Sequence, residues 1–472
     1  MNNLFRLLLP IFPLIFFSGC RNSNHSRQAD SSAGGKMVRN EAKEYVQIQH
    51  PEWTKNATIY EVNIRQFTDE GTFKAFEAHL PRLKAMGIDI LWLMPIHPIG
   101  KEGRKGTLGS PYSVQDYYDV NPEFGDMQSF KNLVDIIHAM GLHVIIDWVA
   151  NHSARDNHLA IQHPEWYIKG RDNQFRSTPW RDYDDIIDFD YNQMELRAYM
   201  INAMRYWVKE ADIDGFRCDV ASFVPIDFWE NARAELNSMK PVFMLAEAAD
   251  RDLHQHAFDA TYSWALWDAL HNITTGLSPL ELLTGGYIAE HVSIWPRDAY
   301  RMNFVDNHDK NAWEGSAYSN FGKGLNAAIV LTCIMDGMPM MYSGQEAGLN
   351  HALPFFEKEA IQWKEDPIRE IYTKLFHLKH HNQALWNGRW GGEMVRINND
   401  KMGQVLSFVR EKNGDKVMAI VNLSDNAVKT TLETQYDQGA YRELFSNKDY
   451  ALSGNDSFEL KAWDYLVLVK NR

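Results

Sequence analysis

Short apolar segments rich in β-branched residues alternate with helical patterns along most of the chain. The segments have the length of strands, and the stretches between them carry apolar residues at helical spacing. Eight alternations of strand and helix are typical of a (β/α)8 TIM barrel, an α/β fold, so we predict this architecture. The predicted strands lie within residues 58–67, 88–96, 142–149, 213–221, 242–248, 258–262, 301–309 and 338–344.

Two regions depart from this alternation. The third and fourth apolar segments are separated by roughly 60 residues, more than one helix and two turns require. The excess, at 150–192, is aromatic and charged and predicts a loop subdomain that shapes a site. Residues 387–472 contain short alternating segments broken by turn residues, which predict a C-terminal antiparallel β-sandwich domain. The barrel is therefore expected over residues 50–386.

The N-terminus is typical of an export signal. The apolar run at 7–17 is too short to span a bilayer as a helix. Small residues before Cys20 resemble a bacterial lipoprotein cleavage site, which implies removal of the signal peptide 1–19 and lipidation of Cys20. Residues 20–49 are expected to form a flexible tether. We therefore expect a lipid-anchored protein of the bacterial cell envelope, with secretion as the alternative.

The charge of the chain restricts its partners. A formal net charge of −14 disfavours nucleic acid and anionic membrane surfaces, because phosphate binding needs clustered Lys and Arg. Any attachment to a membrane would then depend on the lipid at Cys20. The chain has 15 Trp and 20 Tyr, whose flat rings with a polar edge suit sugar faces as well as cores. A neutral ligand such as a sugar fits this composition.

Charged and imidazole side chains gather at the C-terminal ends of the predicted third, fourth, fifth and seventh strands. These strand ends meet on one face of a TIM barrel, which is the face that carries active sites. We therefore expect residues that are far apart in the sequence to form one site. They are Asp147, Asn151, His152, Arg217, Asp219, Glu247, His308 and Asp309.

Several carboxylates at one site suit glycoside hydrolysis. That reaction needs one ionised carboxyl group at the anomeric carbon and one protonated group at the leaving oxygen. A third carboxylate would raise the pKa of the acid through like-charge repulsion. Arg217 precedes Asp219 by two residues, so both lie on one strand face and Arg217 can keep Asp219 ionised.

Four stretches at these strand ends resemble the conserved regions of the α-amylase family, glycoside hydrolase family 13. Two further segments, 110–125 and 337–348, resemble the ends of that family's second and eighth strands. The resemblance covers nearly all of residues 50–472 and implies a retaining mechanism that requires no cofactor for its chemistry. The four stretches are DWVANH (147–152), GFRCDVA (215–221), AEA (246–248) and FVDNHD (304–309).

The resemblance also implies roles for individual residues. Asp219 would be the nucleophile, Glu247 the general acid/base, and Asp309 the stabiliser of an oxocarbenium-like transition state. His152 and His308 would hydrogen-bond the sugar at the cleaved bond.

Three further residues have implied or expected roles at the same sugar. Arg217 would position the nucleophile. Tyr112 would stack on the sugar, with packing at the top of the barrel as the alternative. Asp147 is expected to bond loop backbone amides, with direct sugar contact as the alternative.

A structural calcium ion is left open by the sequence. Many family members hold calcium between the barrel and the loop after the third strand, through an Asn at the position of Asn151. Asp185, Asp188 or Asp190 could supply further oxygen ligands. However, Ser and Phe at 222–223 replace the Lys-His pair that often accompanies calcium dependence.

We therefore predict an α-amylase-like hydrolase of α-1,4-glucans such as starch, maltodextrins and maltooligosaccharides. Val220 and Ala221 resemble the neopullulanase and oligosaccharide-acting branches of the family. Activity as an α-glucosidase, a cyclomaltodextrinase or neopullulanase, or a 4-α-glucanotransferase thus stays an alternative. A non-catalytic glucan-binding member is an alternative of another class, although such relatives usually lose one of the carboxylates that this chain keeps.

Overall fold

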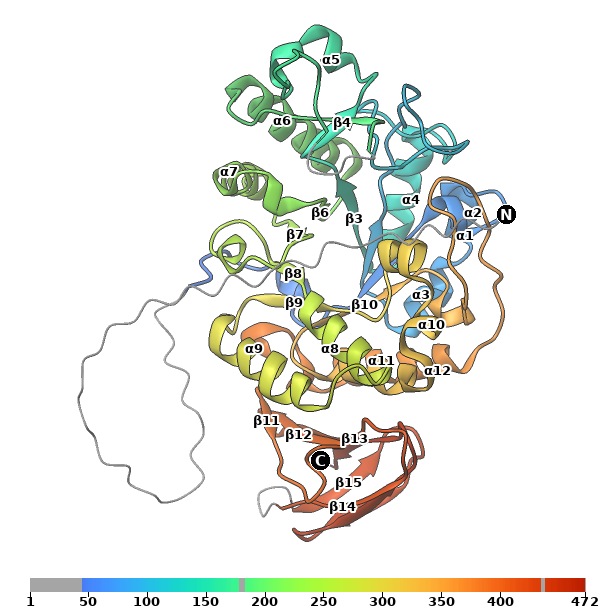
Figure 1. The fold of residues 1–472 in the computed structure, drawn as a ribbon, viewed down its shortest axis with the longest axis vertical. Helices are drawn as coiled ribbons and strands as arrows, with labels where there is room; N and C mark the ends of the chain where they lie inside the picture. The colour runs from blue at the N-terminus through green and yellow to red at the C-terminus, as the bar shows by residue number, and fades with distance from the viewer. Residues whose placement is uncertain (1–44, 178–182, 434–437, 472) are drawn as a thin grey trace, which may run out of the picture. The chain divides into compact units, whose positions relative to one another are not determined.

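Eight parallel strands close into a barrel, as the alternation predicts (Figure 1). The computed structural model describes residues 45–177, 183–433 and 438–471. The predicted signal peptide, the lipidation at Cys20 and most of the tether lie outside these residues. Around the barrel the order is β1-β10-β9-β8-β7-β6-β3-β2. The strands are β1 (Ile59–Val62), β2 (Ile90–Leu93), β3 (His143–Trp148), β6 (Gly215–Cys218), β7 (Phe243–Ala246), β8 (Ala260–Tyr262), β9 (Tyr300–Asn303) and β10 (Met338–Tyr342).

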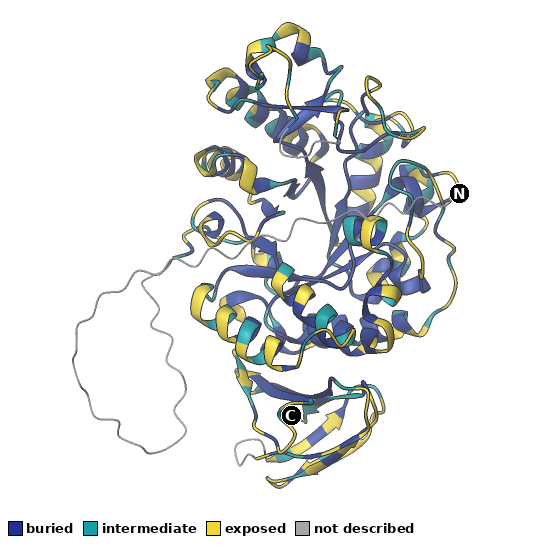
Figure 2. Ribbon diagram, in the orientation of Figure 1, coloured by how far each residue is buried: buried dark blue, intermediate teal, exposed yellow. Residues whose placement is uncertain are grey.

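Helices surround the barrel and turn their exposed residues outward, whereas the barrel strands are buried (Figure 2). The first strand lies within the predicted segment 58–67 and ends at Val62, and the following residues form a short helix. A short buried apolar run does not distinguish strand from helix, so the pattern did not show where the strand ends. The helices are α1 (Ile64–Phe67), α2 (Phe73–Glu77), α3 (Leu80–Met86), α4 (Met127–Ala139), α5 (His158–Gln162), α6 (Met194–Ala211), α7 (Ile226–Asn237), α8 (Trp264–Thr274), α9 (Ala289–Ile294), α10 (Ala317–Phe321), α11 (Leu325–Ile334) and α12 (Pro367–His381).

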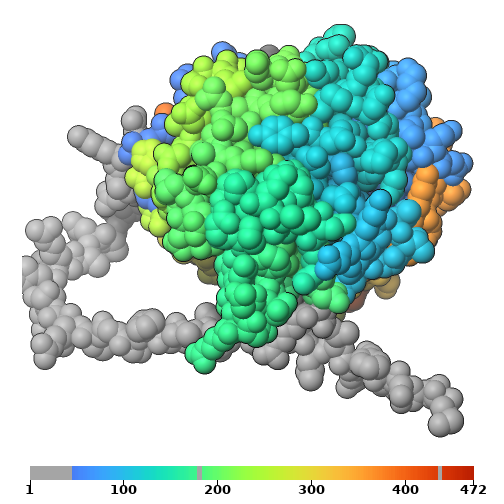
Figure 3. Space-filling view, turned by 90° about the horizontal axis from the view of Figure 1, so that it is seen from above, coloured from blue at the N-terminus to red at the C-terminus, as the bar shows by residue number. Residues whose placement is uncertain are grey.

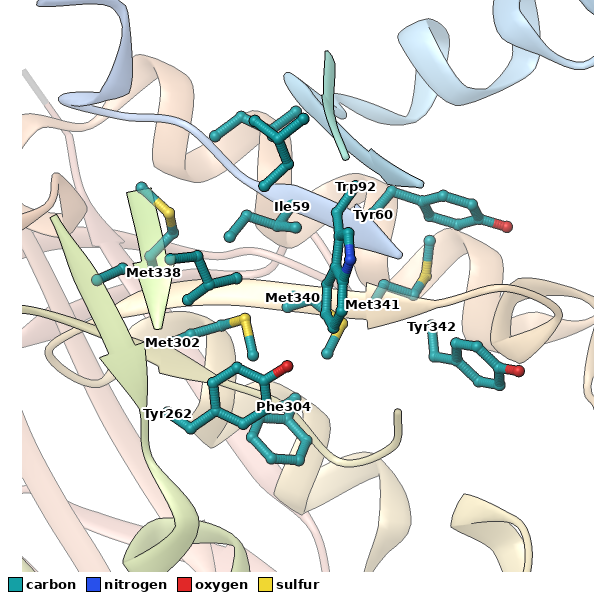
Figure 4. Close-up of a cluster of buried hydrophobic side chains, with 14 of the residues drawn as sticks. Ile59, Tyr60, Trp92, Tyr262, Met302, Phe304, Met338, Met340, Met341 and Tyr342 are labelled. Atoms are coloured by element: carbon teal, nitrogen blue, oxygen red, sulfur yellow. The ribbon is translucent and has the colours of Figure 1, made fainter. Parts of the chain in front are cut away.

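The interior of the barrel is filled by side chains. Figure 4 shows Trp92, Tyr262, Met302 and Met340 turned toward one another from β2, β8, β9 and β10. All four are buried, and the rings of Trp92 and Tyr262 meet edge to face with centroids 6.3 Å apart. The barrel is therefore a packed core, and any substrate must bind at its end.

The long segment after β3 forms a small structure of its own. Strands β4 (His152–Ala154) and β5 (Ile186–Asp188) pair antiparallel, and α5 lies between them in sequence. The described residues between the two strands project from the surface in Figure 3, in teal and green. This is the loop subdomain that the sequence places after the third strand.

The C-terminal region is antiparallel, as predicted, and has two sheets. One has the order β11-β12-β13-β18-β15-β16, and the other pairs β14 with β17. Side chains of both sheets share one apolar cluster, which includes Met418, Val428 and Phe458. Three of the strands, β15 to β17, have only four or five residues. The bounds are β11 (Met394–Arg396), β12 (Val405–Lys412), β13 (Asp415–Asn422), β14 (Val428–Thr431), β15 (Gly439–Glu443), β16 (Asp449–Leu452), β17 (Ser457–Leu460) and β18 (Tyr465–Lys470).

The C-terminal sheet packs directly on the barrel. Phe408 of β12 and Val467 of β18 belong to the same apolar core as the barrel strands. The buried guanidinium of Arg410 donates hydrogen bonds to the backbone oxygens of Ile334 (3.2 Å) and Met335 (2.8 Å), at the end of α11. Apolar contact and buried hydrogen bonds thus join the two regions.

Residues 45–49, which the sequence assigns to the tether, lie on the barrel instead. Val46 is buried, and the N–H of Gln47 donates to the backbone oxygen of Gln255 at 2.9 Å. The guanidinium of Arg251 lies 4.1 Å from the ring centre of Tyr45. Apolar and aromatic contacts therefore order this end of the segment. Within the described ranges, no helix combines the length and apolar character needed to cross a bilayer.

Candidate active site

The predicted polar side chains converge at the C-terminal end of the barrel. Asp147 of β3 is the register partner of Arg217 of β6, so the two side chains lie at one level of neighbouring strands. Asp219 and Glu247 directly follow β6 and β7. Asp309 and His308 lie in the loop after β9, and Tyr112 joins them from the loop after β2. Parallel pairing thus assembles the site from residues that are distant in sequence.

Arg217 is the central cation of the site. Its Nη1 donates to both carboxylate oxygens of Asp147, at 2.8 and 2.9 Å, and to Oδ1 of Asp219 at 3.1 Å. Its Nη2 lies 2.9 Å from Oε2 of Glu247. Burial lowers the pKa of Arg217, but the carboxylates of Asp147 and Glu247 outweigh it and raise the pKa well above its usual value. Arg217 therefore stays charged and contacts Asp219, as expected.

Asp147 holds the guanidinium of Arg217 in place. It is fully buried, and besides Arg217 its Oδ2 accepts from Nε1 of Trp92 at 3.3 Å and from the hydroxyl of Tyr112 at 3.0 Å. The prediction that it bonds loop backbone amides was wrong about its partners. The side chain points into the barrel, where groups on neighbouring strands, rather than loop amides, are within reach. Its burial also leaves no surface for direct contact with a sugar.

His308 forms a second charged centre. Its Nδ1 lies 2.5 Å from Oε1 of Glu61, and its Nε2 lies 2.7 Å from the Tyr112 hydroxyl and 3.3 Å from Oδ2 of Asp309. Burial lowers the pKa of His308, but the carboxylates of Asp309 and Glu61 outweigh it and raise the pKa to about 9. A protonated His308 can donate from Nε2 to the Tyr112 hydroxyl, which in turn donates to Asp147.

Two residues of the site were missed by the sequence analysis. Glu61 of β1 is fully buried and bonds His308. The hydroxyl of Tyr262, at the end of β8, accepts from Nε of Arg217 at 3.1 Å. A single Glu within the otherwise apolar segment TIYEV was the signal for Glu61, since a buried strand excludes an unpaired charge. For Tyr262, the signal was a polar ring at a strand end.

Three carboxylates are more exposed to solvent than the buried residues that surround them. The side chains of Asp219, Glu247 and Asp309 are 10%, 15% and 36% exposed, whereas those of Arg217 and Asp147 are fully buried. A substrate that enters from solvent therefore meets these three groups first.

The surroundings raise the pKa of both inner carboxylates. For Glu247, burial raises the pKa and the charge of Asp309 adds to this, while Arg217 and the N–H of Val220 oppose it. For Asp219, burial and the charge of Glu247 raise the pKa well above its usual value, although Arg217 opposes them. The two groups compete for one cation, so protonation of one favours ionisation of the other.

Val220 links the two inner carboxylates through its backbone. Its φ of 37° and ψ of 48° place it in the left-handed region, which is uncommon for a β-branched residue. In this conformation its N–H donates to Oε2 of Glu247 at 2.8 Å. Backbone strain of this kind costs about 1–3 kcal/mol and persists where the surroundings impose it. The residue after Asp219 thus holds Glu247 in place.

His152 and Asn151 lie at the start of the long loop. His152 is 4% exposed, and burial lowers its pKa to about 4, so its ring is neutral. Nδ2 of Asn151 lies 3.2 Å from Nδ1 of His152. Across the described part of the chain, no group of three or more His, Cys, Asp and Glu side chains is placed to hold a metal ion. Calcium at Asn151 stays a prediction, because its ligands include backbone and side-chain carbonyl oxygens as well as carboxylates.

A surface groove lies beside the inner carboxylates. It has an open volume of about 630 Å³ and is formed by the segments that follow Asp219 and Glu247. Phe223 is 51% exposed on its wall, and Asp250 lies opposite in the other segment. The segments that follow Asp219 and Glu247 thus border open space at the surface.

Comparison with known proteins identifies the family. Residues 26–372 match the family model of the α-amylase catalytic domain. The chain belongs to the α-amylase family. Residues 395–467 of this family member also match the C-terminal domain of maltogenic amylases. The α-amylase family fold and the strand-end site thus agree, and the enzyme is a glycoside hydrolase that needs no cofactor for its chemistry.

The relatives of this α-amylase family enzyme include maltogenic α-amylases and cyclomaltodextrinases. A noncanonic maltogenic α-amylase, AmyB from Thermotoga neapolitana, is 32% identical, with a TM-score of 0.80 over 89% of this chain and 100% of its own. The maltogenic α-amylase of Bacillus acidopullulyticus is 24% identical over 471 residues, which cover 89% of this chain and 78% of that protein. A cyclomaltodextrinase from a Bacillus species is 24% identical over 435 residues, covering 79% and 74%.

Proposed function

We propose that the enzyme is a retaining hydrolase of α-1,4-glucosidic bonds that prefers short or cyclic glucans, in the manner of maltogenic amylases and cyclomaltodextrinases. The names of the relatives and the match of the C-terminal region support this choice. The observation that carries the mechanism is the single guanidinium of Arg217, which contacts both Asp219 and Glu247. Arg217 thereby holds the nucleophile Asp219 and the acid Glu247 close together at the C-terminal end of the barrel.

The proposed reaction proceeds in two steps. Asp219 attacks the anomeric carbon while Glu247 gives its proton to the leaving oxygen, which yields a glycosyl ester on Asp219. In the second step Glu247 takes a proton from water, the water oxygen attacks the anomeric carbon, and the ester bond to Asp219 breaks, so the sugar is released with its original configuration. Retaining enzymes hold the two carboxyl groups about 5–5.5 Å apart. Contact of both groups with one guanidinium supports such a short separation.

The remaining groups of the proposed mechanism act on the sugar ring. Asp309 is the most exposed of the three carboxylates and stabilises the positive charge that develops at the anomeric carbon. His308 stays protonated through Glu61 and Asp309, and in the proposed complex its Nε2–H passes from the Tyr112 hydroxyl to a sugar hydroxyl. His152 contacts the same sugar as a neutral ring, and Tyr112 stacks on it.

Glucan transfer is the second candidate activity. Phe223 exposes half of its side chain in the groove beside Glu247. An apolar ring there can stack on a sugar that replaces water as the acceptor. Transfer differs from hydrolysis only in that acceptor, so the same carboxylates serve both reactions.

A product profile over time tests the proposal. We expect cyclodextrin and maltotriose to be consumed faster than amylose or pullulan, with products first released as the α-anomer in NMR. Products longer than maltotriose in the maltotriose reaction would indicate transfer. Binding without cleavage of any of the four substrates would contradict the proposal and favour a glucan-binding protein.

We further propose that the enzyme is anchored to the bacterial cell envelope by lipid on Cys20. The small residues before Cys20 and the apolar run at 7–17 support this. In its natural type of host, Cys20→Ala should move the protein from the membrane to the soluble fraction without loss of hydrolytic activity. The wild-type protein, fractionated in parallel, is the control. Equal membrane association of both proteins would contradict the anchor.

A further inference from the structure

Aromatic side chains lead from the site to the protein surface. The ring of Tyr112 stacks on His308, with centroids 5.3 Å apart, and on Phe355, with centroids 6.1 Å apart. Phe355 in turn contacts Trp313 and Phe356, each at 5.2 Å between centroids. Trp313 is 53% exposed and lies in the turn that directly follows Asp309. We call Trp313, Phe355 and Phe356 the aromatic platform.

Buried amides hold the platform in place. Nε2 of Gln66 donates to the backbone oxygens of Pro354 (2.8 Å) and Glu357 (3.0 Å), and its Oε1 accepts from the N–H of Glu359. Oδ1 of Asn311 accepts from the N–H of Leu353 at 2.8 Å, which ties the platform's loop to the turn that carries Trp313. A surface that is already rigid loses little entropy on binding.

In the proposed reaction, the platform lies near the glucose unit that stays bound to Asp219 after the first step. Glu247 protonates the leaving oxygen in that reaction, so we place the released part of the glucan on the side of Glu247, toward the groove at Phe223. The platform contacts Tyr112 and His308 instead, the groups that hold the sugar attached to Asp219. A small cavity, lined among others by His308 and Phe355, lies between the site and the loop that carries Phe355 and Phe356.

We propose that the aromatic platform binds the glucose unit next to the cleaved one on its non-reducing side, with Trp313 stacked on the sugar ring. This inference rests on the proposed function and makes it more specific. A tightly held second unit favours release of a disaccharide over release of glucose. Trp313 determines this specificity, and the chemical step is carried by the three carboxylates.

Cleavage of para-nitrophenyl α-maltoside tests the proposal with an internal ratio. Cleavage at the aryl bond places both glucose units before the cut and uses the platform. Cleavage between the two glucose units leaves the platform empty. We expect Trp313→Ala to lower the ratio of aryl to inter-glucose cleavage about tenfold, and Trp313→Phe to restore most of it because a flat ring remains.

Two controls separate stacking from structural damage. Trp390→Ala removes another partly exposed Trp, at the edge of the C-terminal region, and should leave the ratio unchanged. The melting temperature of Trp313→Ala should stay near that of the wild type. A ratio unchanged by Trp313→Ala, whether or not total activity falls, would overturn the platform. A wild-type protein that cleaves neither bond would overturn the proposed function itself.

Discussion

Replacement of Asp219 by Asn is expected to lower kcat on maltooligosaccharides by at least about 10⁴-fold, because an amide cannot form the glycosyl ester. The fold should remain intact. Asn has the shape of Asp, and its side-chain oxygen can still accept from Nη1 of Arg217. Burial and Glu247 already disfavour the charge on Asp219, so its removal should not lower the melting temperature.

The assay for Asp219→Asn is single-turnover hydrolysis with excess enzyme, together with thermal unfolding. Asp212→Asn is the matched control, because Asp212 lies before β6, at the other end of the same strand, and is exposed. Asn also tolerates the left-handed conformation of that residue. Hydrolysis by Asp219→Asn at the wild-type rate would exclude Asp219 as the nucleophile.

Replacement of Glu247 by Gln is expected to have the second largest effect. Natural glucans should lose about 10²–10⁴-fold in kcat/KM, because their leaving oxygen needs a proton. Substrates with an activated leaving group, such as α-glucosyl or α-maltosyl fluoride, should lose much less in the first step. An equal loss on both types of substrate would contradict the acid role.

The pH profile gives an independent measure of the same variant. The nucleophile must be ionised, so kcat/KM falls as the pH drops through the pKa of Asp219. The charge of Glu247 raises that pKa, and Glu247→Gln removes it. The acid-side limb of the profile should therefore move to lower pH, and the limb caused by loss of the proton from Glu247 should disappear. An acid limb that stays in place would mean that the two groups do not interact.

The barrel could be predicted because its signals are local. Each strand is a short apolar segment, each helix has its own spacing, and the strand ends carry polar residues that cannot be core. The polar side chains at these strand ends therefore contact one another as the pattern predicts, namely Asp147, Arg217, Asp219, Glu247 and His308. All strands of a parallel barrel end at the same face, so the strand pattern alone predicts that these residues lie close together.

The partners within the site were not predictable in the same way. Glu61 and His308 are 247 positions apart, and neither segment shows which residue of the other will face it. Asp147 was matched with the wrong partners because its neighbours on β2 and β6 are fixed by register and by side-chain direction. The strands β15 to β17 have only four or five residues, too few for an alternating pattern to identify a strand and its partners. Long-range pairing, rather than propensity, decided each of these features.

The contact between the C-terminal sheet and the barrel bears on how the enzyme unfolds. The side chains of Phe408 and Val467 complete the barrel's core, and Arg410 supplies donors to carbonyl groups at the end of α11. Loss of the sheet would leave those carbonyl groups without their donor and expose apolar surface. Although the topology changes near residue 387, the barrel and the C-terminal sheet are thus expected to unfold together. Barrel and sheet should melt in one calorimetric transition, so a protease that opens either one would destroy both.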